Sequence, residues 1–149
     1  MHSLRALPGL AMLIGCGGFW PAPGLAAPPD QGPEPITLIE RDNNRTLTMR
    51  SGDQLRIMLR ESAGTGYSWQ IEEIDPTRLK SLGNQSRPEP PLEQTPGRPP
   101  LVGGPLQHAF LFRCLRPGAT RLSLRHWRVW EGPNSVDRRF TVKLRILAP

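Results

Sequence analysis

The chain has 149 residues and a formal net charge of +6. That length allows one domain with a buried core. The basic balance permits binding to nucleic acid or another anionic surface but does not argue for it. The two cysteines, Cys16 and Cys114, exclude a disulfide-rich scaffold.

Residues 1–26 have the pattern of an export signal. Arg5 is the only charged side chain before Asp30, and 7–14 is an apolar run too short for a lasting membrane helix. Two processing sites compete. The segment LIGC, ending at Cys16, resembles a bacterial lipobox in which Cys16 carries the lipid, and GLA at 24–26 suits a general signal peptidase. Either site predicts an exported protein, in the periplasm or at the cell surface, that touches a membrane only through such a lipid.

A polar, proline-rich linker is expected over 27–35, followed by the folded domain over 36–149. The domain opens with two short alternating runs, 36–41 (ITLIER) and 46–50 (TLTMR). Asp42-Asn43-Asn44 between them has turn chemistry.

A third run, 54–60 (QLRIMLR), alternates apolar and polar residues, and 67–72 (YSWQIE) has the aromatic and β-branched character of a strand. The residues between them are small. A small-residue loop can approach another surface closely, and Gly64 and Gly66 can take positive φ angles.

Residues 87–105 are dense in proline. Proline has no N–H for a sheet ladder, so this segment predicts a long exposed loop. The residues before it, 78–82, fit a short strand or a turn.

The second half of the chain has the clearest strand pattern, over 106–115, 120–127 and 140–146. Apolar residues alternate with polar ones in each run, and Arg116-Pro117-Gly118 marks a turn between the first two. Seven or eight short strands without a helical period predict an all-β fold, a β-sandwich.

Three motifs, in order and separated by strands, resemble the chagasin family of protein inhibitors of papain-like cysteine peptidases. They are 62–67 (SAGTGY) with Trp69 two positions on, 101–104 (LVGG), and 128–133 (RVWEGP). The chain departs from the family pattern in lacking an Asn-Pro pair in the first motif and in having Val129 where the third motif has proline. Both prolines would stiffen a loop, so their absence bears on affinity.

The resemblance implies an immunoglobulin-like sandwich and a reversible, non-covalent inhibitor, not an enzyme. It implies that the first loop enters the peptidase cleft while the other two brace the walls of the cleft. The partner would be a papain-like cysteine peptidase of the same cell or of a host, bound by a monomer without a cofactor. The residues it assigns to peptidase binding are Ser62, Ala63, Gly64, Thr65, Gly66, Tyr67, Val102, Gly103, Gly104, Arg128, Val129 and Trp130.

Two other functions stay open. One is an adhesion or assembly module of the cell envelope that uses the same sandwich without binding a peptidase. The other is an enzyme or ligand-binding domain built on the proline-rich loop, although no convergent titratable groups support it. Nucleic-acid binding is disfavoured because the arginine-rich faces lack interleaved aromatic residues.

Several chemistry-bearing side chains are expected to be structural. Trp69 and Cys114 are expected in the core, Trp127 partly packed and Trp130 exposed. A metal site that includes His108 and Cys114 is excluded, because the two residues are about 20 Å apart along one strand.

Overall fold

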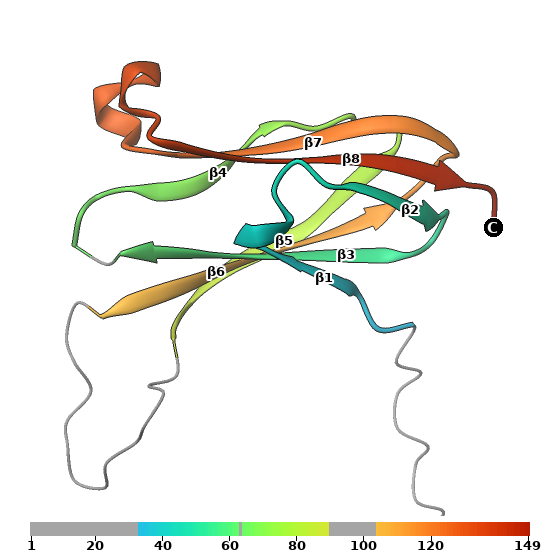
Figure 1. Ribbon diagram of the computed structural model, residues 1–149, viewed down its shortest axis with the longest axis horizontal. Coiled ribbons are helices and arrows are strands. Elements are labelled where there is room, and N and C mark those ends of the chain that lie inside the picture. Colours follow the sequence, from blue (N-terminus) through green and yellow to red (C-terminus); the bar gives the residue numbers. More distant parts are fainter. Residues whose placement is uncertain (1–32, 63, 90–103) are drawn as a thin grey trace, which may run out of the picture. The chain divides into compact units, whose positions relative to one another are not determined.

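The computed structural model describes residues 33–62, 64–89 and 104–149. Within these residues the chain forms eight strands in two four-stranded sheets and no α-helix, which confirms the predicted all-β sandwich (Figure 1). The strands are β1 (Ile36–Ile39), β2 (Thr46–Arg50), β3 (Gln54–Ser62), β4 (Ser68–Glu73), β5 (Leu79–Pro88), β6 (Pro105–Cys114), β7 (Gly118–Trp127) and β8 (Arg138–Leu147). Short 3-10 turns are η1 (Glu40–Asp42), η2 (Val129–Glu131) and η3 (Pro133–Ser135).

One sheet has the strand order β1-β3-β6-β5 and the other β2-β8-β7-β4. The pairs β1–β3 and β2–β8 are parallel, and the remaining neighbours are antiparallel. The turn predicted at 42–44 therefore carries the chain from one sheet to the other. The first strand is shorter than the alternating pattern suggested, because Glu40–Asp42 leave it to form η1.

The alternating apolar residues of both sheets meet in one core. Along β3, the side chains of Leu55, Ile57 and Leu59 are fully buried while Arg56 and Arg60 are exposed. Phe110 and Phe112 of β6 and Phe140 of β8 are the largest fully buried side chains. Burying each such side chain contributes roughly 1.5–3 kcal/mol, so the two inner faces hold the sheets together.

The proline-rich segment is shorter than predicted at both ends. β5 runs for 10 residues, as far as Pro88, where the sequence suggested a short strand or a turn over 78–82. Pro88 is tolerated because β5 is the edge strand of its sheet, and Pro105 is tolerated as the first residue of β6. Residues 90–103 lie outside the described residues.

The strand register determines which loops meet. Ser62 at the end of β3 is the Cα partner of Pro105 at the start of β6. Ser68 at the start of β4 is the partner of Trp127 at the end of β7. The connections that follow or precede these residues therefore emerge at the same end of the domain, opposite the C-terminus (Figure 1).

Candidate functional site

Two of the predicted binding segments, and the last residue of the other, lie at this shared end. The loop 62–67 joins β3 to β4, residues 128–133 follow β7, and Gly104 directly precedes β6. Their common position follows from the register just described. Ala63, Val102 and Gly103 lie outside the described residues, so the second segment is represented by Gly104 alone.

The loop 62–67 is closed by its own hydrogen bonds. The Thr65 hydroxyl donates to the carbonyl oxygen of Ser62 at 3.0 Å and accepts from the Tyr67 N–H at 3.4 Å. Gly64 and Gly66 have φ angles of 85° and 77°, which only glycine adopts without strain. The chain thus makes a narrow, protruding turn from small residues.

Arg128 connects this loop to the segment after β7. Its Nε donates to the carbonyl oxygen of Thr65 at 3.0 Å, and its guanidinium carbon lies 4.5 Å from the centre of the Tyr67 ring. Its Nη1 also donates to Glu131 at 2.9 Å. Because one planar group makes all three contacts, it fixes the relative position of the two segments.

Trp130 is the most exposed large apolar side chain of the described part of the chain, with 68% of its surface accessible. Its ring nevertheless lies against Gly66, where an added Cβ would be 2.6 Å from Cζ2 of Trp130. Neighbouring Val129 is 54% exposed. Trp127 is only 8% exposed and packs under Arg125, so the predicted contrast between the two tryptophans is confirmed.

The Tyr67 ring rests on a buried histidine that the sequence interpretation did not select. His126 stacks on Tyr67 with ring centres 5.1 Å apart and contacts Trp69 at 5.0 Å. Its Nδ1 is hydrogen-bonded to Asp137 at 2.7 Å. Trp69 is 3% exposed, as predicted. A sequence signal existed, since His126 continues the inward phase of Leu122 and Leu124 along β7.

Glu61 was also missed, and it anchors the loop from inside the sandwich. Its carboxylate accepts from the Ser86 hydroxyl at 2.8 Å and from the Trp69 N–H at 3.3 Å, and lies 3.2 Å from Nδ1 of His108. Glu61 is 7% exposed and directly precedes Ser62. The sequence did carry a signal for Glu61, because it occupies the next inward-facing position of β3 after Leu59.

Ser135 stabilises the turn that lacks the proline of the family motif. Its hydroxyl oxygen accepts from the Arg128 N–H at 3.1 Å. The carbonyl oxygens of Gly132 and Arg128 both lie within reach of the hydroxyl proton, at 2.7 and 2.9 Å. These contacts close the segment at its base and leave Trp130 at its outer surface.

Nucleophilic and metal chemistry find no support in the described residues. Cys114 is 1% exposed, and burial, together with the nearby charge of Asp53, raises the pKa of its thiol to about 11. No group of three or more His, Cys, Asp or Glu within the described residues is placed to hold a metal ion. No helix among them is long and apolar enough to cross a membrane.

The fold is a β-sandwich that presents, at one end, two loops joined by Arg128 and an exposed tryptophan. Residues 48–144 match the family described as chagasin family peptidase inhibitor I42. The chain is 31% identical to amoebiasin-2 of Entamoeba histolytica over 109 residues, which are 73% of this chain and 83% of that protein. It is 27% identical to amoebiasin-1 of the same organism over 111 residues, 74% of this chain and 99% of that protein.

A solved structure supports the same assignment. The crystal structure of the cysteine protease inhibitor EhICP2 from Entamoeba histolytica superposes with a TM-score of 0.65 and 27% sequence identity, and the match covers 78% of this chain and all of that one. The chain belongs to the chagasin family of peptidase inhibitors. Its family consists of inhibitors rather than enzymes, and the immunoglobulin-like sandwich predicted from the resemblance is confirmed.

Proposed function

We propose that this protein inhibits papain-like cysteine peptidases reversibly by placing the loop 62–67 in the active-site cleft. Residues 128–133 and 101–105 contact the walls of the cleft on either side. The observation that carries the proposal is the junction of Arg128 with Thr65, because it joins the first and third loops into one edge. The amoebiasin relatives and EhICP2, whose title calls it a cysteine protease inhibitor, support the choice of target.

The shape and chemistry of this edge suit an open groove. Residues Gly64, Thr65 and Gly66 have small side chains and project from a rigid β body, so they can enter a cleft with little backbone movement. Exposed Trp130 and partly exposed Arg128 are the residue types that dominate binding energy in interfaces. An interface of ordinary size, roughly 800 Å² on each partner, would cover all three segments.

The direct test is titration of papain and cathepsin L with the purified protein at fixed substrate. We expect tight inhibition that is recovered on dilution, with the inhibitor remaining intact on a denaturing gel. A serine peptidase such as trypsin is the negative control. Absence of inhibition at micromolar protein across several papain-like enzymes would rule out the proposed function.

Size-exclusion chromatography with light scattering tests the monomeric state that we propose for the free inhibitor.

Export to the periplasm or cell surface is part of the proposal and is supported by the composition of residues 1–26. N-terminal sequencing and mass spectrometry of the mature protein distinguish lipid attachment at Cys16 from cleavage after Ala26. An unprocessed chain retained in the cytoplasm would contradict export without affecting the inhibitory edge.

A further inference from the structure

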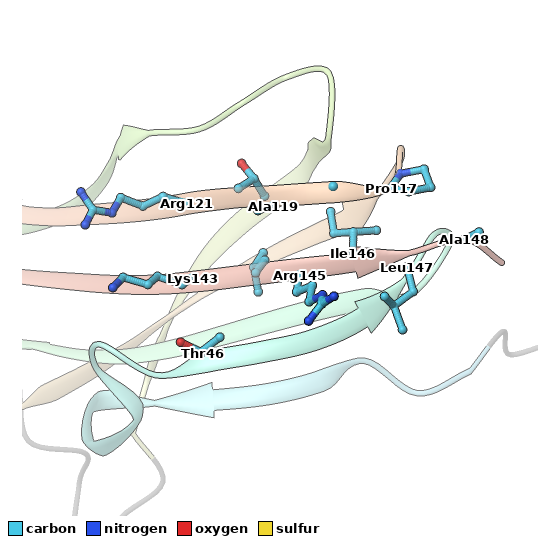
Figure 2. Close-up of a pocket in the computed structure, with 12 residues that line it drawn as sticks. Thr46, Pro117, Ala119, Arg121, Lys143, Arg145, Ile146, Leu147 and Ala148 are labelled. Carbon is cyan, nitrogen blue, oxygen red and sulfur yellow. The ribbon is translucent and has the colours of Figure 1, made fainter.

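The outer face of the β2-β8-β7-β4 sheet carries basic side chains that the inhibitory edge does not use. Arg121 on β7 and Lys143 and Arg145 on β8 are exposed, and we call these three residues the basic face. Arg121 is the direct cross-strand partner of Lys143, and Arg145 is the partner of Ala119. Figure 2 shows Arg121 and Lys143 side by side on neighbouring strands.

The basic face is not neutralised within the described part of the chain. No carboxylate among those residues forms an ion pair with Arg121, Lys143 or Arg145. Like charges directly opposite each other destabilise a sheet. An anionic partner would therefore remove an electrostatic cost that the free protein carries at this face.

A second like-charged pair on the same two strands shows how the protein relieves such a cost elsewhere. Arg125 of β7 is the partner of Arg139 of β8. Arg139 is paired with Glu72 at 3.0 Å, and the guanidinium carbon of Arg125 lies 3.5 Å from the centre of the Trp127 ring. Arg121 and Lys143 have no comparable contact among the described residues. On the other sheet, the exposed cross-strand pair of Lys80 and Arg113 also lacks an ion pair.

An apolar hollow adjoins these cations. It has a volume of about 800 Å³ and lies between the start of β7 and the end of β8, with Thr46 of β2 at its edge (Figure 2). Its apolar lining includes Pro117, Ala119, Leu147 and Ala148. Leu147 is 41% exposed. Cationic heads and an apolar recess thus share one surface.

We propose that the basic face docks this protein onto a membrane surface of anionic phospholipids. Headgroup phosphates bind Arg121, Lys143 and Arg145, and the hollow contacts the apolar part of the lipid. A lipid is favoured because it matches both the charge and the apolar recess. Single-stranded nucleic acid would ask for exposed aromatic rings, and Trp127, the tryptophan on this sheet face, is covered by Arg125.

This docking is compatible with peptidase binding. Arg121 lies toward the start of β7, whereas Arg128 follows its end at Trp127. Arg121 and Arg128 are seven positions apart, which corresponds to roughly 23 Å along an extended strand. A protein bound to lipid through the basic face therefore keeps its inhibitory edge free.

The test is co-sedimentation of the protein, carrying Cys16→Ser to prevent lipid attachment, with phosphatidylcholine vesicles that contain or lack phosphatidylserine. We expect binding only to the anionic vesicles, weakening with salt. The Arg121→Glu/Lys143→Glu variant should lose at least about 30-fold in affinity, since each Lys or Arg near an anionic membrane contributes roughly fivefold. Leu147→Asn should weaken binding without altering the charge of the basic face.

Arg56→Glu/Arg113→Glu is the matched control. It makes the same change in net charge at exposed positions on the other sheet and should retain vesicle binding. Thermal melting of each variant establishes that it is folded. No binding of the parent protein to anionic vesicles, or equal losses in both double variants, would overturn the proposal. Tighter binding to DNA than to vesicles, lost in the Arg121→Glu/Lys143→Glu variant, would also overturn it by assigning the face to nucleic acid.

Discussion

The ring of Trp130 occupies the space that a side chain at Gly66 would need, since a Cβ at Gly66 would lie 2.6 Å from Cζ2 of Trp130. The two residues belong to different loops, and the bond from Arg128 to Thr65 joins the same loops nearby. The protruding turn and the exposed indole therefore form one surface, and changing either residue should disturb both.

Gly66→Ala should weaken papain inhibition by at least about tenfold, or ~1.4 kcal/mol, and Gly66→Trp by more. The new side chain displaces the indole of Trp130 from its contact, and the φ angle of 77° adds backbone strain. Inhibition constants measure the loss of papain inhibition. The indole signal of Trp130 in NMR spectra reports the displacement of its ring.

Gly52→Ala separates backbone strain from the clash. Gly52 has a φ angle of 95°, and a Cβ there would meet no atom within 4 Å. Both alanine variants should lose about 1–2 kcal/mol of folding stability from left-handed backbone geometry, but Gly52→Ala should inhibit normally. Equal inhibition by the two variants would argue against the contact between Trp130 and Gly66 as a determinant of binding.

Arg128→Lys should weaken inhibition by roughly tenfold although it keeps the positive charge. Lysine cannot reproduce the bond to Thr65 together with planar stacking over Tyr67. Inhibition constants and backbone NMR shifts of the loop 62–67 provide the measurement. Glu131→Gln is the control, because the exposed ion pair of Arg128 with Glu131 contributes at most about 1 kcal/mol. A larger loss of inhibition in Glu131→Gln than in Arg128→Lys would mean that Glu131, rather than the contacts of Arg128 with the loop 62–67, determines binding.

Trp130→Ala should reduce affinity by at least ~30-fold, or about 2 kcal/mol, as expected for an exposed aromatic anchor. Its melting temperature should change little, because 68% of the side chain is accessible. Trp69→Ala is the contrasting variant, because the Trp69 side chain is buried in the core. Its removal should lower the free energy of unfolding by about 3–5 kcal/mol. If Trp130→Ala inhibits as well as the parent protein, the assignment of residues 128–133 to peptidase contact is wrong.

The Cys114 thiol should resist alkylation in the native protein and react readily in denaturant. Burial raises its pKa from 9.0 to about 11. The folded protein thus holds the thiol proton more tightly than the unfolded chain does, and the free energy of unfolding falls as pH rises from about 9 to about 11. Cys114→Ala should remove that part of the pH dependence in denaturant titrations. Rapid labelling of a Cys16→Ser variant at neutral pH would contradict a buried thiol.

The sequence by itself determined the sandwich and its inward faces. Alternation along 54–60 and 140–146 predicts which side chains are buried because a strand turns successive residues to opposite sides, and Leu55, Ile57 and Phe140 follow it. The ordered motifs at 62–67 and 128–133 predicted the family for the same local reason, since each is a short contiguous pattern.

Only the tertiary structure decided how those motifs cooperate. The contacts of Arg128 with Thr65, of His126 with Tyr67 and of Glu61 with His108 join residues distant in the chain, and their pairing depends on strand order and register. The crossing of β1 and β2 into different sheets and the unrelieved charge pair of Arg121 and Lys143 arise in the same way. Periodicity shows which side of a strand a residue faces, whereas its neighbour across the sheet exists only once the chain has folded.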